Sequence, residues 1–174
     1  MLKPTRSESI FVYQFLCVFC ALLLSSVRAY PQNISYLGVG VGVFKVFHED
    51  DPQLNSYGSI NYRPTIELFG YGTWSALACT DREVYLSGGI LQDFYLTESI
   101  VITPSFGLGI YLENDGYDLG SPLEFRPEIK TSYEFVDKSR LGLSFGHVSN
   151  AELGDKNPGA NYISVMYSIP LNIK

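Results

Sequence analysis

Apolar and polar residues alternate with a period of two over most of this chain. In 123–135, Leu123 and Phe125 alternate with Glu124 and Arg126. Because successive side chains of a β-strand point to opposite faces, this period predicts strands with one apolar and one polar face. The stretches with this pattern are 34–47, 58–69, 73–79, 83–92, 100–111, 123–135, 140–149 and 161–171. We therefore expect an all-β protein of about eight strands.

Eight long antiparallel strands can close into a barrel whose interior is filled by side chains. A soluble barrel turns its apolar face inward, whereas a membrane barrel has an apolar lipid face, aromatic girdles and a polar interior. The polar face of 123–135 carries charges of both signs, which can neutralise one another in a narrow interior, or which face water as on most sheets. Thirteen tyrosines, many of them near strand ends, suit the interfacial belts. We favour an eight-stranded antiparallel transmembrane β-barrel of the outer-membrane type.

The first 29 residues have the layout of a secretory signal peptide. Lys3 and Arg6 precede an apolar run over 10–24, and small residues lead to a cleavage site after Ala29. The run is short for a spanning helix, so an uncleaved anchor is the weaker alternative. We expect a signal peptide over 1–29, which is removed on export, and a single barrel domain over 30–174.

Charge and cysteine content narrow the classes of partner and cofactor. Without the leader the chain keeps nine basic and seventeen acidic residues, a net charge of about −8. This balance argues against nucleic acid as a partner, because nucleic-acid binding needs basic clusters. Cys79 is then the only cysteine, so neither a disulfide nor a metal site built from it and two histidines is expected. We expect no metal and no cofactor.

A candidate base and nucleophile lie at the end of the strand predicted over 140–149. His147 and Ser149 are two residues apart, so they share a face with the apolar residues Leu141, Leu143 and Phe145. An isolated serine hydroxyl is a poor nucleophile, and an adjacent imidazole that takes its proton activates it. A reactive pair on an apolar face suits an enzyme whose substrate lies in a membrane.

The same segment carries a resemblance to a known family. His147-Val-Ser149-Asn150-Ala, followed by Asn157-Pro-Gly, resembles the core of the lipid A 3-O-deacylase family, which is also described as acyloxyacyl hydrolase-like. Leu119–Arg126, Arg140–Gly146 and Tyr167–Leu171 extend the similarity. The resemblance is strong over 104–171, and only strand pattern and glycines agree before that.

The resemblance implies an eight-stranded outer-membrane barrel of Gram-negative bacteria that hydrolyses an ester of lipid A. Ser149 would be the nucleophile and His147 its general base, both on the outside of the barrel. Asn150 and Asn157 would lie near the oxyanion site. The implied partner is lipid A, or lipopolysaccharide, in the outer leaflet; a homodimer is kept as an alternative to a single barrel.

One position departs from the family pattern. The family's acid, normally Glu, follows the histidine by fourteen positions, where this chain has Asn161. An asparagine still accepts a hydrogen bond from the imidazole but supplies no negative charge, which costs a serine enzyme on the order of 10⁴ in rate. Three interpretations stay open: a slower enzyme with Asn161 as the orienting residue, replacement of the acid by Glu152 or Asp155, or a catalytically silent barrel with a structural or surface role.

Overall fold

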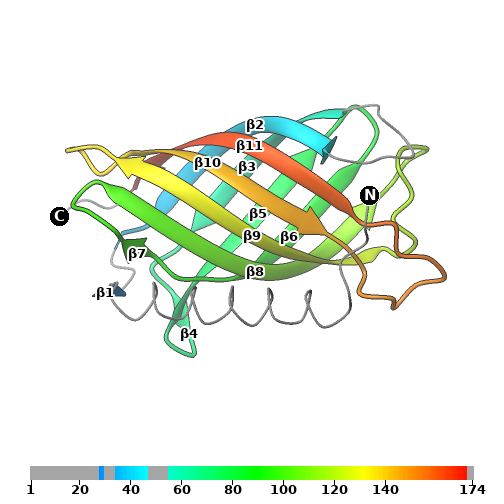
Figure 1. Cartoon of the computed structure of the whole chain (residues 1–174), viewed down its shortest axis with the longest axis horizontal. Helices are drawn as coiled ribbons and strands as arrows, with labels where there is room; N and C mark the ends of the chain where they lie inside the picture. The colour runs from blue at the N-terminus through cyan, green and yellow to red at the C-terminus, as the bar shows by residue number, and fades with distance from the viewer. Residues whose placement is uncertain (1–27, 30–33, 47–54, 172–174) are drawn as a thin grey trace, which may run out of the picture.

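The computed structural model describes residues 28–29, 34–46 and 55–171, and within them eight long strands form a closed antiparallel barrel (Figure 1). Alternating apolar and polar positions predicted them; seven cover most of a predicted stretch, and β3 covers the first half of the stretch predicted over 58–69. The long strands are β2 (Tyr36–Val46), β3 (Asn55–Arg63), β5 (Tyr71–Cys79), β6 (Val84–Leu91), β8 (Ile100–Leu112), β9 (Leu123–Glu134), β10 (Arg140–Val148) and β11 (Ala160–Pro170).

Each long strand pairs with its neighbours in the sequence, so the barrel has a simple up-and-down order. The last strand, β11, pairs with β2, where Val165 lies opposite Val41, and this pairing closes the sheet. Closure leaves no long strand with an unpaired edge, as a chain that crosses a bilayer requires. Three two-residue strands lie outside this ring: β1 (Arg28–Ala29), β4 (Glu67–Leu68) and β7 (Phe94–Tyr95).

The prediction of one continuous strand over 58–69 is wrong beyond Arg63. The chain leaves β3 at Pro64, and β4 then pairs with the beginning of β5 as a separate hairpin. Proline has no backbone N–H and cannot donate to the ladder, which explains the end of β3. Alternation alone did not reveal the turn because Ile66 and Leu68 keep the period of two across it.

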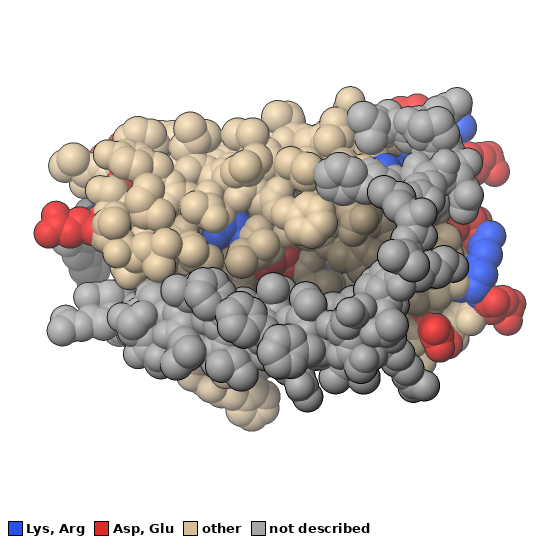
Figure 2. Space-filling model, viewed as in Figure 1, with Lys and Arg blue, Asp and Glu red and all other residues tan. Residues whose placement is uncertain are grey.

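The apolar side of the alternation lies on the outside of the barrel. On β10, Leu143 is 57% exposed, whereas Ser144 next to it is 1% exposed. Leu141 and Phe145 are also exposed. In Figure 2 the charged side chains of the visible face lie mainly at the two ends of the molecule, and the band between them is mostly uncharged. This distribution is that of a membrane barrel, as the sequence predicted.

Buried charged side chains form ion pairs in the interior of the barrel. Asp93 accepts from Arg63 at 3.0 Å and from Arg140 at 2.6 Å, and all three side chains are at most 9% exposed. Arg126 pairs with Glu128 at 2.9 Å. Charge neutralisation in the interior is one of the two expectations for the polar face of 123–135, but Glu124 of that face takes no part in it: neither of its buried carboxylate oxygens has a hydrogen-bond partner among the described residues.

Two long loops lie at the same end of the barrel. The ends of β8 and β10 lead into the β8–β9 loop (residues 113–122) and the β10–β11 loop (residues 149–159) at the same end (Figure 1).

The described residues contain no helix long and apolar enough to cross a membrane. The predicted leader lies outside the described residues except for Arg28–Ala29, which pairs with Phe94–Tyr95. The signal peptide therefore stays a prediction.

Candidate active site on the outer wall

His147 and Asn161 lie directly opposite each other on the neighbouring strands β10 and β11. The distance between His147 Nδ1 and Asn161 Oδ1 is 2.9 Å. An amide oxygen only accepts, so this contact places the proton of the neutral imidazole on Nδ1 and leaves Nε2 as the basic nitrogen. The residue at the position of the family's acid therefore orients the imidazole here.

A β-bulge on β2 helps to orient Asn161. Asn161 pairs with Val46 and Tyr162 pairs with Phe44, so Lys45 is an extra residue with a φ of 63°. The bulge brings the Val46 carbonyl oxygen to 3.4 Å from Asn161 Nδ2, which donates to it. With its amide nitrogen engaged on this side, Asn161 presents its oxygen to the imidazole. Bulges commonly re-aim a side chain beside an active site in this way.

Ser149 follows β10 and shares the outer face with His147. Its backbone exchanges two hydrogen bonds with Phe125 of β9, at 2.8 and 3.1 Å. The hydroxyl makes no hydrogen bond to any described residue, so contact with the imidazole is not formed in this structure. Such catalytic hydrogen bonds often tighten only when substrate binds.

Gly159 packs against the basic edge of the imidazole. A Cβ atom at this position would lie 2.8 Å from His147 Cε1 and 2.9 Å from Nε2, closer than real side chains approach. Its φ of 59° is also one that other residues adopt with strain. Glycine therefore leaves the space that the His147 ring occupies and lets the loop pass close to Nε2.

The two candidate oxyanion donors have different surroundings. Asn150 is 0% exposed, and its Nδ2 donates to the carbonyl oxygens of Leu119 and Lys156, each at 2.8 Å. Its Oδ1 accepts from Glu152 N at 2.9 Å. Both amide hydrogens are thus engaged, and Asn150 has none left for an oxyanion.

Asn157 remains as the asparagine with a free donor. Its Oδ1 accepts the backbone N–H of Asn150 at 3.2 Å, and its Nδ2 makes no hydrogen bond to a described residue. The side chain is exposed. The amide is therefore held by its oxygen, and its nitrogen is available.

An apolar groove of about 420 Å³ runs down the outer wall from His147. The β9–β10 register continues to the Phe125–Ser149 bridge and places Pro127 beside His147. Pro127 removes a ladder N–H, while Ile129 and Phe145 form apolar walls farther along the strands. The groove is open to the surface that faces the hydrocarbon of a bilayer, so an acyl chain fits its chemistry.

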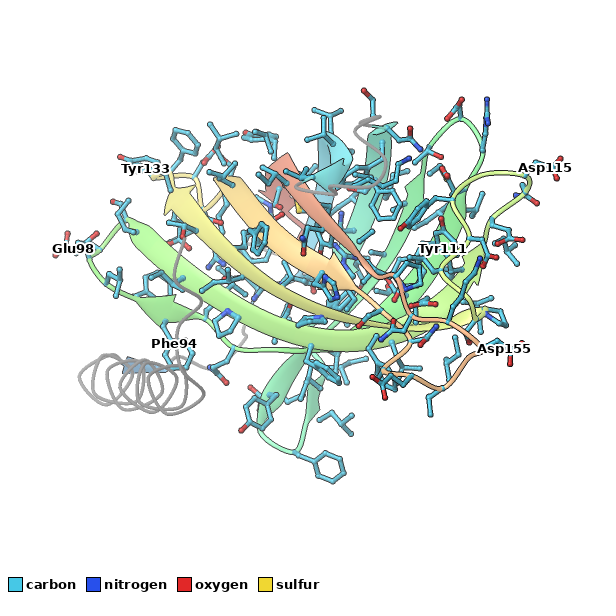
Figure 3. All side chains as sticks on the ribbon, turned by 45° about the vertical axis from the view of Figure 1, so that its right-hand side comes forward. Phe94, Glu98, Tyr111, Asp115, Tyr133 and Asp155 are labelled. Atoms are coloured by element: carbon cyan, nitrogen blue, oxygen red, sulfur yellow. The ribbon has the colours of Figure 1, made fainter. Side chains whose placement is uncertain are left out.

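The two carboxylates considered as replacements for the missing acid lie elsewhere. Glu152 and Asp155 are exposed, and neither forms a hydrogen bond with His147. Figure 3 shows Asp155 at the outer tip of the β10–β11 loop, at the same end as Asp115. In this structure Asn161, and neither of these carboxylates, contacts the imidazole.

The described residues do not form a recognisable metal-binding site. No group of three or more His, Cys, Asp or Glu side chains there is arranged to hold an ion.

Four contributors to the site were not recognised from the sequence. The Val46 carbonyl and Pro127 lie on other strands, so only the strand register brings them to His147. The positive φ of Lys45 has no local sequence signal, because lysine does not favour it. For Gly159 a signal exists, since a glycine that follows Asn157-Pro often marks a tight turn.

Comparisons with known proteins agree with this architecture. The family described as lipid A 3-O-deacylase (PagL) matches residues 36–170. A solved structure described as the crystal structure of the outer membrane enzyme PagL aligns with a TM-score of 0.58 and 18% sequence identity. The alignment covers 78% of this chain and 99% of that one. A comparison with curated proteins finds no match.

Proposed function

Because the chain belongs to the lipid A 3-O-deacylase family, whose members hydrolyse an ester of lipid A, we propose that Ser149 is the nucleophile of this reaction. His147 is its general base. The observation that carries the proposal is the 2.9 Å contact between His147 Nδ1 and Asn161, because it leaves Nε2 basic on the face that Ser149 shares. A serine and an imidazole held in this way are suited to acyl transfer.

The reaction proceeds through an acyl-enzyme. His147 Nε2 takes the proton of Ser149 as the hydroxyl oxygen attacks the ester carbonyl carbon. Collapse of the tetrahedral intermediate breaks the ester bond, and the imidazolium returns the proton to the departing lipid A hydroxyl. Water then attacks the acyl-serine with the same base, which releases the fatty acid and restores the hydroxyl.

Asn157 stabilises the oxyanion in both steps. Its Nδ2 is an available side-chain amide donor in the β10–β11 loop, and the loss of one oxyanion donor typically costs 10²–10³ in kcat. Asn150, which the sequence grouped with it, supports the loop instead. Our assignment of the oxyanion donor is therefore Asn157.

Asn161 controls the tautomer of His147 but does not stabilise the imidazolium that forms during attack. A carboxylate provides both effects, and the charge is a large part of its contribution. We therefore propose a working but slower enzyme, which is one of the three interpretations that the sequence left open.

The membrane supplies the substrate directly to the outer wall. We propose that the chain reaches the bacterial outer membrane through a cleaved leader over 1–29, and that the β10–β11 loop faces the lipid A leaflet. The scissile ester then meets His147, while its acyl chain follows the groove beside Ile129 and Phe145 into the hydrocarbon. Dimerisation of the barrel stays a prediction.

Mass spectrometry of lipid A tests the proposal. Cells that express the wild-type chain should lose one ester-linked acyl chain from lipid A, whereas cells with Ser149→Ala or His147→Ala should keep it. Leu86→Ala, on the outer face of β6, is a matched control that should behave as wild type. If lipid A had the same acyl pattern in cells that express the wild type and in cells that express each of the three variants, the silent structural barrel would be favoured instead.

A further inference from the structure

The β8–β9 loop contacts the β10–β11 loop through backbone atoms. A Cβ atom on Gly120 would lie 2.1 Å from the Lys156 carbonyl oxygen, and one on Gly154 would lie 2.1 Å from the Gly120 carbonyl oxygen. Neither neighbour is a flexible side-chain end that could move aside. Two glycines thus allow the loops to pack more closely than any other residue would permit.

Leu119 fixes the β8–β9 loop to the barrel. Its side chain is 1% exposed and packs in the cluster that contains Val148, at the end of β10, and Ala160, at the start of β11. Its carbonyl oxygen accepts from Asn150 Nδ2. The β8–β9 loop is therefore anchored where β10 ends and β11 begins, at the base of the β10–β11 loop.

Asn150 connects this anchor to the oxyanion donor. Its side chain binds Leu119 in one loop and Lys156 in the other, while its own backbone N–H binds Asn157 Oδ1. An asparagine amide can rotate freely unless its oxygen or nitrogen is held. The Asn150 N–H holds the oxygen of Asn157, so the nitrogen of Asn157 points away from the loop backbone.

From this arrangement we infer that the β8–β9 loop is part of the catalytic machinery, and that Asn150 is the positioning residue through which it aligns Asn157. The inference rests on the proposed function, since it deepens the role of the same site. Neither Asn150 nor Gly120 touches the reacting atoms. Their contribution reaches the reaction only through the direction of the Asn157 amide.

A double-mutant cycle tests whether Asn150 acts on the reaction through Asn157. The variants Asn150→Ala, Asn157→Ala and their combination are compared on a soluble acyl ester, with kcat and KM measured separately. We expect Asn150→Ala to lower kcat about 10²-fold with KM changed less than about twofold, the size of a lost oxyanion donor. The combination should be no slower than Asn157→Ala alone, within about threefold. Losses that multiply would overturn the inference, because Asn150 would then act independently of Asn157.

Gly120 provides a second variant that leaves both asparagines unchanged. Gly120→Ala should lower kcat in the same way, because its methyl group displaces Lys156 and thereby loosens Asn150. Gly70→Ala is the matched control: its φ of 81° carries the same backbone penalty, but no atom lies within 4 Å of the added carbon. Equal kcat values for Gly120→Ala and Gly70→Ala would contradict the role of the loop.

Amide hydrogen exchange separates failure of this inference from failure of the proposed function. Gly120→Ala should speed exchange in residues 149–159, whereas Gly70→Ala should leave that segment unchanged. This result does not depend on turnover. An inactive wild type would overturn the proposed function, and unchanged exchange in Gly120→Ala would overturn the coupling between the loops.

Discussion

His147 on β10 and Asn161 on β11 form a directly opposed pair whose side chains meet on the outer wall, 2.9 Å apart. Because both residues lie in the barrel sheet, their relative position is set by the strand register and varies little with loop motion. The pair has the geometry of a catalytic dyad but lacks a negative charge. We expect the absence of that charge to limit the rate of the enzyme.

Asn161→Glu should raise kcat between about tenfold and 10⁴-fold, because the carboxylate stabilises the imidazolium that forms as Ser149 attacks. The measurement is the steady-state rate on an acyl ester. Asn161→Leu keeps a similar size without an acceptor and should be slower than wild type, since the tautomer is no longer held. An Asn161→Glu enzyme no faster than wild type would show that the missing charge does not limit the rate.

Gly159→Ala should lower kcat at least about 10²-fold, because the methyl group collides with the imidazole at Cε1 and Nε2. The added φ strain costs about 1 kcal/mol and does not unfold the barrel. Rates and thermal unfolding are measured together, with Gly70→Ala as the control for strain alone. Full activity in Gly159→Ala would mean that the ring moves aside without consequence.

Ile129→Trp should obstruct the groove below His147 and lower kcat/KM more for long acyl esters than for short ones. Ile129 is 51% exposed on the wall of the groove, so the larger ring occupies the space of the chain. A series of esters with increasing chain length checks this. Leu86→Trp, on the outer face of β6, adds the same ring away from the groove and should leave chain-length preference unchanged. If the two variants had the same chain-length preference, the groove would not be the site that binds the acyl chain.

Asp93→Asn should destabilise the barrel by about 3–5 kcal/mol, because Arg63 and Arg140 lose the buried carboxylate that they share. Denaturant unfolding in lipid or detergent measures the free energy of unfolding. Asp81→Asn removes a carboxylate of an exposed pair with Arg82 at 3.6 Å and should cost less than about 1 kcal/mol. Equal costs for the two variants would contradict a structural role of the interior charges.

The carboxyl of Asp118 should titrate below its ordinary pKa of 3.8, because Lys156 Nζ and the Gly120 N–H both bind its charged form. Its folded pKa lies below the unfolded one, so the contact supports the two loops above pH 3.8 and is lost as pH falls through the folded value. Carbon-detected NMR of the side chain gives the midpoint. Lys156→Met should move that midpoint upward, and an unmoved midpoint would show that the lysine has no effect on the pKa.

The strands could be predicted because every strand of the barrel wall lies between two different environments. Hydrocarbon on one side and a polar interior on the other impose the alternation seen at Leu143 and Ser144, so sequence and burial agree. The prediction failed after Arg63, where Ile66 and Leu68 keep the period within a hairpin. Periodicity reports which face a residue occupies but not where a strand turns.

The juxtaposition of His147 and Asn161 was predictable for a similar reason, because the parity of two strands places both residues on the same outer face. The roles of the two asparagines were not. Asn150 and Asn157 both stand in the family motif, and their residue types are identical. Only the loop contacts show that Asn150 is enclosed by Leu119 and Lys156 while Asn157 keeps a donor available.

By itself the sequence determined the barrel, the outward direction of the His–Ser segment and the identity of the residue at the acid position. These properties depend on side-chain type and on the two-residue period, which are local. The tertiary structure decided the bulge at Lys45 that brings Val46 to Asn161, the space at Gly159 and the contact between the two loops. Each of these depends on register and on approach between segments far apart in the chain, which no local pattern encodes.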